Sequence, residues 1–126
     1  MNTLLNLAAR ILLAQFFILA GLGKIINYDG TAAYMQAFHV PTSLLPLVIL
    51  LEVGGGMAIL LGWKVRWFAP LLALFSIMAA LIFHHDFSNE TQWILFIGDL
   101  STAGGLLLLA QAGALAPALD ARKQHY

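Results

Sequence analysis

Four ionisable side chains lie inside long apolar stretches of the sequence, where they are costly unless they are paired or reach water. Glu52 lies near the middle of the nineteen-residue run 44–62, while Arg10, Lys24 and Asp99 lie in two other apolar runs. Each would cost about 2.5–3.5 kcal/mol at the centre of an isolated membrane-spanning helix. We therefore expect these side chains to compensate one another.

Their depths favour a cluster of Lys24, Glu52 and Asp99. Counted at 1.5 Å per helical residue from the outer boundary, Glu52 lies about 12 Å deep, Asp99 about 9 Å and Lys24 about 3 Å. A helical side chain leans toward the N-terminus of its helix, so Lys24 leans back into the membrane toward both carboxylates. Arg10 starts at the opposite boundary, and snorkelling to the water there is its easier solution.

Two interpretations of the charged residues remain open. In the first, two cations and two anions neutralise one another and fix the helix register without doing chemistry. In the second, they line an outward-facing pocket in which Glu52 and Asp99 are the catalytic carboxylates and exchange protons with a small polar or quinonoid ligand. Lys24 and Arg10 are then candidate ligand-binding residues.

Two histidines, His39 and His84, should lie near the mouth of such a pocket and are further ligand-binding candidates. They fit three roles: polar residues at the membrane interface, a proton relay, or ligands of a metal or haem. A haem held by two histidines would need them inside facing spans, where the sequence has none. The chain also lacks cysteine, so we predict no haem, iron–sulfur cluster or metal site.

The elements that must position these residues are long apolar helices. Of the 126 residues, 61% are hydrophobic and 10% are charged, against about 25% charged in soluble domains. The sequence predicts one all-α transmembrane domain over 1–126, an integral membrane four-helix bundle in a lipid bilayer. Because basic and acidic residues balance, no nucleic-acid partner is expected. The predicted spans are about 4–26, 44–62, 67–83 and 93–110, followed by a cytoplasmic tail of about 114–126.

Smaller elements are expected around and between the spans. A short interfacial helix should run from about 32 to 38, between the first and second spans, with 29–31 turning and capping it. Small residues recur at helical spacing in two of the spans and predict close contacts with neighbouring helices. They are Gly54, Ala58 and Gly62 in the second span, and Gly98, Thr102 and Gly105 in the last.

The distribution of charge predicts the orientation in the membrane. Basic residues gather on one side, at Lys64, Arg66, Arg122 and Lys123, whereas the opposite side is mainly acidic. Both termini should therefore be cytoplasmic, in a multi-pass protein of a bacterial inner membrane. The first apolar segment also resembles a signal peptide, but its apolar character precedes Arg10 and its cleavage site is weak, which favours a retained span.

Several short patches, taken together in order and spacing, resemble the DoxX family over nearly the whole chain. The patches are Ala9-Arg10, Gly21 to Lys24, Tyr28 to Thr31, Val40-Pro41, Leu51 to Gly56, Phe83-His84 and Gly104 to Leu108. The resemblance implies a four-helix inner-membrane protein related to quinol-oxidase and thiosulfate:quinone oxidoreductase subunits. It also implies a polar signature, made of Arg10, Lys24, Glu52 and His84. Asp99 and His39 depart from the family's usual residues, which makes a substrate carried over from relatives doubtful.

The charged residues and the family resemblance are compatible with three functions. The first is a quinone-linked oxidoreductase component that binds a quinone or a small aromatic ligand near Glu52. Because the chain has no redox centre of its own, it would need a partner oxidoreductase subunit or would use the quinone directly. The second is a non-catalytic accessory or assembly subunit whose small-residue stripes pack against partners. The third is a small-molecule carrier, which would need a homo-oligomer because four helices leave little lumen.

Overall fold

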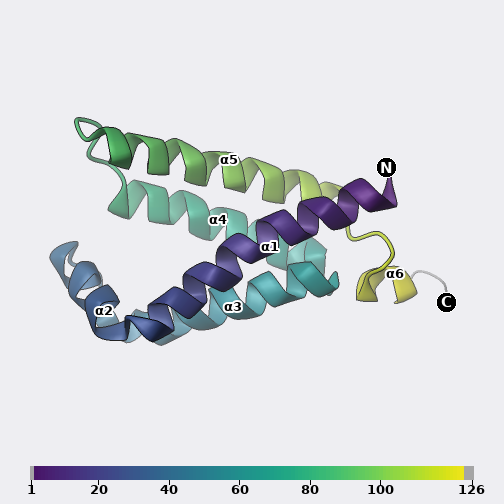
Figure 1. The fold of residues 1–126 in the computed structure, drawn as a ribbon, viewed down its shortest axis with the longest axis horizontal. Coiled ribbons are helices and arrows are strands. Elements are labelled where there is room, and N and C mark those ends of the chain that lie inside the picture. The colour runs from purple at the N-terminus through teal and green to yellow at the C-terminus, as the bar shows by residue number, and fades with distance from the viewer. Residues whose placement is uncertain (1, 124–126) are drawn as a thin grey trace.

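The structure is a computed structural model that describes residues 2–123 and consists of helices joined by short connections (Figure 1). Four of the described helices, α1, α3, α4 and α5, are long and apolar enough to cross a membrane. The crossing formed by α3 also includes η1, a short 3-10 turn that precedes it. The elements in chain order are α1 (Thr3–Ile26), α2 (Tyr28–Ala37), η1 (Thr42–Leu44), α3 (Leu45–Leu61), α4 (Val65–Phe83), α5 (Glu90–Ala112) and α6 (Leu119–Lys123).

The four long helices form two pairs, α1 with α3 and α4 with α5, and contacts between the pairs are fewer than contacts within them. Figure 1 shows that the start of α1, the helix α6 and the α3–α4 turn lie at one end of the bundle, which we call the terminal end. The pairs converge there and diverge toward the opposite end, where α2 lies, which we call the α2 end. The protein is therefore an all-α membrane bundle that is splayed at one end.

Local sequence signals explain where the long helices begin and end. Asn2 Oδ1 accepts a hydrogen bond from Leu4 N at 2.7 Å and caps α1, and Asn89 Oδ1 caps α5 through Gln92 N. Gly62 ends α3 with φ of 71°, a left-handed conformation that glycine adopts without steric cost. The helix bounds lie within a few residues of the predicted spans.

The short helix α2 is longer than the sequence suggested. It begins at Tyr28 rather than near residue 32, because Asn27 ends α1 and starts α2 without an intervening loop: its N–H donates to Gly23 O and its carbonyl accepts from Thr31 N. Residues 29–31 therefore lie in the first turn of α2 and do not cap it. The position of α2 at a membrane interface stays a prediction.

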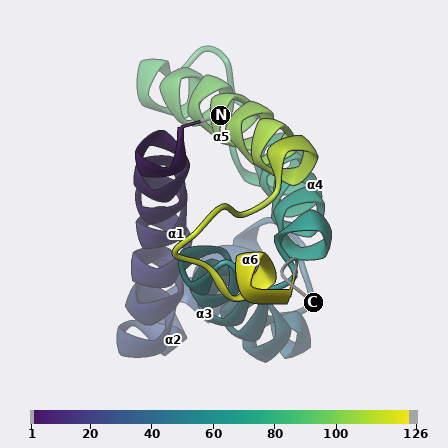
Figure 2. The ribbon, with the colours of Figure 1, turned by 90° about the vertical axis from the view of Figure 1, so that its right-hand side faces the viewer.

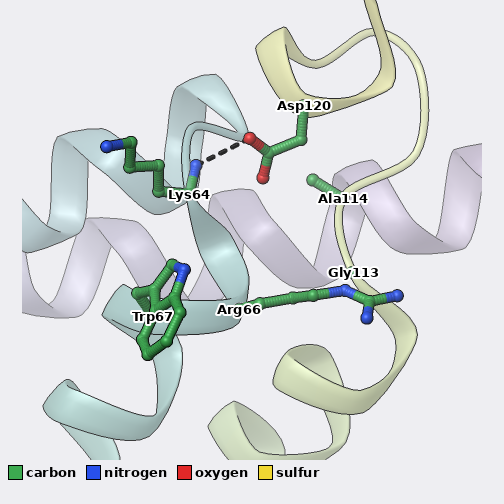
Figure 3. A pocket seen from close by; sticks show the side chains of 6 residues that line it. All are labelled: Lys64, Arg66, Trp67, Gly113, Ala114 and Asp120. Atoms are coloured by element: carbon green, nitrogen blue, oxygen red, sulfur yellow. Dashed lines mark hydrogen bonds between the residues drawn. The ribbon is translucent and has the colours of Figure 1, made fainter. Parts of the chain in front are cut away.

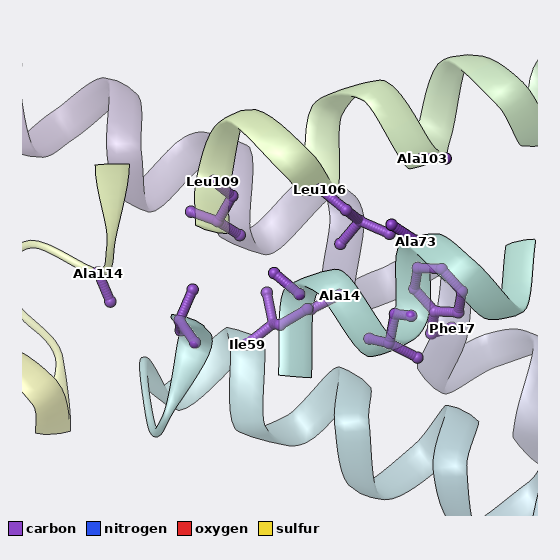
Figure 4. Close-up of a cluster of buried hydrophobic side chains, with 11 residues drawn as sticks. Ala14, Phe17, Ile59, Ala73, Ala103, Leu106, Leu109 and Ala114 are labelled. Carbon is purple, nitrogen blue, oxygen red and sulfur yellow. The ribbon is translucent and has the colours of Figure 1, made fainter. Parts of the chain in front are cut away.

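The hydrophobic core lies in the half of the bundle nearer the terminal end. Phe17 of α1, Ile59 of α3, Leu72 of α4 and Leu106 of α5 are each at most 1% exposed and meet between the helices (Figure 4). Alanines fill the spaces between these larger side chains, which lets the helices approach closely. Arg10, Ala14, Phe17 and Gly21 recur along α1 at intervals of four and three residues, a spacing that predicts one inward face, and all four are buried.

The predicted tail after α5 is packed against the bundle, at least to residue 121. It leaves α5, crosses the terminal end toward α1 and returns to α6 (Figure 2). Ala114 is 1% exposed and Ala121 is 6% exposed, and Asp120 N donates to Gly62 O at 2.8 Å. The last part of the predicted tail, 124–126, lies outside the described residues.

Asp120 attaches this segment to the start of α4. Its Oδ1 accepts a hydrogen bond from Lys64 N at 2.7 Å and its Oδ2 accepts one from Val65 N at 3.0 Å, so it caps the helix from a distant part of the chain (Figure 3). A hollow of about 200 Å³ lies beside the contact and is also lined by Arg66 and Trp67. The first turn of α4 thus depends on the docked C-terminal segment.

Candidate functional site between Lys24 and His84

Close contact between α1 and α3 places the first charged pair. A Cβ on Gly21 would lie 2.5 Å from Val53 Cγ2 and 3.3 Å from Glu52 Cβ, so glycine at this position lets the two backbones approach. Gly56 fulfils the same role on α3, where a Cβ would lie 2.8 Å from Ile18 Cγ1. Lys24 follows Gly21 by about one helical turn and therefore comes to lie beside Glu52.

Lys24 and Glu52 form a buried ion pair. Lys24 Nζ lies 2.6 Å from Glu52 Oε1. The lysine side chain is 29% exposed, whereas the glutamate side chain is 3% exposed. A carboxylate so far from water requires a cation or a proton, because desolvation of an unpaired charge is costly. The lysine supplies the cation and still reaches accessible space itself.

A second pair joins the last two long helices. His84, at the end of α4, has Nε2 at 3.8 Å from Asp99 Oδ2 on α5. Its other ring nitrogen, Nδ1, lies 3.0 Å from Gln92 Oε1, one to two helical turns before Asp99 on α5. An amide oxygen accepts a hydrogen bond, so this arrangement assigns the proton of a neutral ring to Nδ1 and turns Nε2 toward the carboxylate.

The two pairs interact electrostatically. Lys24 acts electrostatically on Asp99 as well as on Glu52, and the two carboxylates act on each other. The structure thus places Lys24, Glu52 and Asp99 in one region, as the depths in the sequence suggested. It adds His84 as the direct partner of Asp99.

A cavity of about 350 Å³ lies at the α2 end between the two helix pairs, and the basic member of each charged pair lines it. Glu52 and Asp99 are not among the described residues that line the cavity; each lies behind its own basic partner. The remaining lining is mostly apolar and comes from α2, α3, α4 and the connection between α2 and α3, which includes η1. It includes Thr31, Tyr34, Met35, Val40, Leu44, Leu45, Val48, Phe75, Met78, Ala79, Ile82 and Phe83.

Aromatic contacts between the α2 region and α4 cover this cavity at the α2 end of the bundle. Tyr34 stacks on Phe83 of α4 with the ring centroids 5.4 Å apart, and Phe38 meets the same ring edge-on at 5.2 Å. His85 lies against Phe38 on the outer side of this cluster. These contacts bridge the two helix pairs at the end where they diverge.

Two predicted ligand-binding residues lie elsewhere. Arg10 and Lys24 are fourteen residues apart on one helix, which separates them by about 21 Å. His39 is exposed in the turn after α2, with φ of 59°, and is not among the described residues that line the cavity. Neither side chain belongs to the site that Lys24 and His84 share.

Arg10 was also expected to snorkel to water, and that prediction is wrong. Its side chain is fully buried and donates hydrogen bonds to Leu60 O at 3.2 Å, Leu115 O at 3.1 Å and Pro117 O at 2.7 Å. Asn6 Oδ1 accepts a further bond from Arg10 Nε at 3.1 Å. Arg10 therefore reaches carbonyl groups of the docked C-terminal segment, which the sequence suggested was a tail, and joins that segment to α1 and α3.

The small-residue stripes are only partly correct. A Cβ on Gly54 or Gly98 would meet nothing within 4 Å among the described residues, so these two glycines face outward. On α3 the close contacts are made by the next two glycines: Gly55 packs against Leu72 of α4, and Gly56 packs against α1. Ala58 is 4% exposed and a Cβ on Gly105 would lie 3.5 Å from Leu13 Cδ2, so these predicted members of the stripes do face neighbouring elements.

The sequence analysis did not identify three polar residues that form hydrogen bonds with His84 or with the C-terminal segment. Gln92 orients His84, while Asn6 and Asp120 anchor the C-terminal segment. Asn6 precedes Arg10 by one helical turn on the same buried face, a spacing that could have revealed it. Gln92 and Asp120 bond to residues that the local pattern does not single out.

Chemically, the site offers two nitrogen groups to one apolar cavity, each next to a carboxylate. Lys24 donates hydrogen bonds, and the imidazole of His84 can donate or accept one according to its protonation. Glu52 and Asp99 can stabilise the charged form of these groups or exchange a proton with them. Such a site fits a flat or apolar molecule that carries oxygen acceptors.

Comparison with known proteins agrees with this architecture. The DoxX family model matches residues 5–85. Inner membrane protein YqjF of Escherichia coli (strain K12) is 47% identical over 114 residues, which cover 90% of this chain and 88% of the relative. Inner membrane protein YphA of the same organism is 35% identical over 125 residues, covering 94% and 89%. No solved structure matches. The chain therefore belongs to the DoxX family of membrane proteins.

Proposed function

We propose that this protein binds a quinone, or a similar small aromatic molecule with oxygen acceptors, in the cavity between Lys24 and His84, as a component of a quinone-linked membrane oxidoreductase. One observation carries the proposal: nitrogen groups from two helices line the same apolar cavity, and each has a carboxylate behind it. The cavity of about 350 Å³ is within the size range of small-molecule sites. The family resemblance points to the same class of ligand.

The chain's own residues bind the ligand and supply protons. Lys24 Nζ donates to one oxygen of the bound molecule, and His84 reaches another part of the cavity from α4. Glu52 and Asp99 replace protons on these groups, because each lies beside one of them. A quinone, when bound, takes up a pair of electrons and a pair of protons to become a quinol, the electrons coming from a reduced partner oxidoreductase subunit.

The proposed topology places the terminal end in the cytoplasm of a bacterial cell and the cavity near the outer face of the inner membrane. Lys64 and Arg66 lie in the α3–α4 turn and first turn of α4, at the terminal end, which the positive-inside rule assigns to the cytoplasm. Two relatives, YqjF and YphA, are named as inner membrane proteins of Escherichia coli. Protons would then reach His84 from the outer side.

Ligand retention tests the proposal. The protein is purified in detergent, loaded with a quinone, passed through a sizing column and extracted, and the retained quinone is quantified. We expect wild-type protein to retain quinone and the Lys24→Met and His84→Leu variants to retain at least tenfold less. Lys24→Met can also weaken the fold, so Ala79→Leu, which adds bulk to the cavity and keeps every charge, provides a second test.

Leu81→Phe is the control, because it adds bulk to α4 at an exposed position that does not line the cavity. Equal retention by wild-type, Ala79→Leu and Leu81→Phe proteins would contradict the proposal. A folded wild-type protein that retains no quinone would contradict it as well. That second result would favour an accessory subunit, whose outward-facing Gly54 and Gly98 are available for close packing against a partner helix.

A further inference from the structure

The wall of the cavity between α3 and α4 differs from its other walls. At the level of Gly55, the two helices are in tight contact, since a Cβ there would lie 3.2 Å from both terminal methyl carbons of Leu72. Toward the α2 end, Val48 lies about two turns from Gly55 on α3, and Phe75 lies about one turn from Leu72 on α4. Both of these residues line the cavity. The helices therefore separate beyond the glycine contact, and the cavity fills the space between them.

Residues along this wall are reached from outside the protein as well as from the cavity. Leu44 is 42% exposed, Met78 is 50% exposed and Ile82 is 36% exposed, and all three line the cavity. They belong to α4 and to the η1–α3 crossing, in the half of each crossing nearer the α2 end. Leu44 and Ile82 lie at the ends of their crossings, near the expected membrane interface, whereas Met78 lies more than one turn inside α4, where the surroundings of a membrane bundle are lipid chains.

The α1 side of the cavity carries a charged residue. Lys24 lies there beside Glu52, and Met35 of α2, which is 6% exposed, covers the cavity next to it. The stacking of Tyr34 on Phe83 joins α2 to α4 at the end of the bundle. A molecule in the cavity would therefore meet the Lys24 donor on the α1 side, His84 at the end of α4, and an apolar opening between α3 and α4.

We propose that the α3–α4 opening is a lateral portal through which a lipid-soluble quinone enters from the bilayer and in which its isoprenoid tail rests. This inference depends on the proposed function and narrows the ligand to quinones that carry a long apolar tail. The head of the ligand lies near Lys24 and His84, while the tail passes Val48 and Met78 into the surrounding lipid. A tail is accommodated here because it exchanges one apolar environment for another, so leaving the lipid costs it little.

The test compares two quinones that share a head group, which separates the role of the portal from binding of the head group at the site. One carries a long isoprenoid tail and the other carries none, and retention of each is measured after incubation with protein in lipid nanodiscs. The double variant Leu44→Cys/Ile82→Cys is treated with a flexible bis-maleimide before the quinone is added. Because the natural chain has no cysteine, the reagent can join only these two positions. The untreated double variant and each treated single-cysteine variant are the controls.

We expect the cross-link to lower uptake of the tailed quinone at least tenfold and to leave uptake of the tail-less quinone unchanged. Met78→Trp should act in the same direction without a cross-link. Leu74→Trp is its matched control, since Leu74 lies one turn away on α4 and is 56% exposed but does not line the cavity. Normal uptake of the tailed quinone by both the cross-linked and the Met78→Trp proteins would overturn the portal and leave the proposed function intact. Failure of wild-type protein to retain either quinone would overturn both.

Discussion

Lys24 Nζ and Glu52 Oε1 lie 2.6 Å apart across the α1–α3 interface, and of these two side chains it is the lysine that lines the cavity. The glutamate is the more deeply buried partner, at 3% exposure against 29% for the lysine. The pair can therefore serve structure and chemistry together. The carboxylate fixes the position of the lysine, and the lysine presents its ammonium group to the ligand.

This asymmetry predicts unequal effects of single substitutions at the pair. Lys24→Met leaves a buried carboxylate without its cation and should lower the free energy of unfolding by about 3–5 kcal/mol. Glu52→Gln leaves a lysine that can extend toward accessible space, so the loss should be smaller, about 1–3 kcal/mol. Chemical unfolding in detergent micelles measures both values.

The double variant Lys24→Met/Glu52→Gln completes the cycle and should recover much of the loss caused by Lys24→Met, because no buried charge remains. A Lys24→Met protein as stable as Glu52→Gln would show that the carboxylate does not depend on this lysine.

Two neighbouring glycines of α1 should respond in opposite directions to the same substitution. Gly21→Ala places a Cβ 2.5 Å from Val53 Cγ2 at the α1–α3 contact and should lower the free energy of unfolding by about 1–3 kcal/mol. Gly23→Ala meets nothing within 4 Å among the described residues and should raise it by about 0.5–1 kcal/mol, because alanine favours a helix interior. Thermal unfolding of the two variants checks the signs, and destabilisation of both would contradict the assigned contact.

Much of the membrane architecture could be predicted from the sequence, because the length of an apolar span and the spacing of residues along a helix are local properties. The inward face of α1, with Arg10, Ala14 and Phe17, followed from helical spacing alone. The face of α3 was harder to predict, because this helix is apolar on all sides apart from Glu52, and three consecutive glycines leave its small face ambiguous. Leu72 and Ile18 on neighbouring helices determine that Gly55 and Gly56, and not Gly54, make the contacts.

The charged residues of the site could be predicted from the sequence, but the arrangement of their side chains around the cavity could not. Depth along each helix brought Lys24 near Glu52, since both depths are set by the 1.5 Å rise of a helix. Depth does not reveal which side chain faces the cavity, and it does not reveal long-range bonds such as those of Arg10 to Leu115 O and Pro117 O. Those depend on the path of a connection that has no periodic pattern.

The C-terminal segment should lose protection when Arg10 is changed. Arg10→Met removes the donors to the carbonyls of Leu115 and Pro117, so the backbone amides of 113–121 should exchange with deuterium at least tenfold faster. Hydrogen exchange with mass spectrometry measures this rate. Lys64→Gln removes an exposed cation at the same end and should leave exchange in the segment unchanged. Unchanged exchange in Arg10→Met would show that this arginine does not hold the segment.

Capping of α4 by Asp120 should have a separate effect. Asp120→Ala leaves the N–H groups of Lys64 and Val65 without their acceptor and should lower the free energy of unfolding by about 0.5–2 kcal/mol. Exchange of those two amides should rise as well. Asp29→Ala, at an exposed position in the first turn of α2, is the matched control and should change the stability less. An equal effect of the two substitutions would contradict a capping role for Asp120.

The contact between Gln92 and His84 predicts the tautomer of the imidazole. Gln92 Oε1 lies 3.0 Å from His84 Nδ1, and an amide oxygen there favours a proton on Nδ1 in the neutral ring. Nitrogen-15 NMR of labelled histidine should show this tautomer in the wild-type protein, and Gln92→Leu should shift the population toward a proton on Nε2. The neutral Nε2–H can then donate toward Asp99, which lies 3.8 Å away. Retention of quinone should fall in Gln92→Leu, whereas Thr91→Leu, at an exposed neighbouring position, should leave it unchanged. The same tautomer in wild-type and Gln92→Leu proteins would show that another group orients His84.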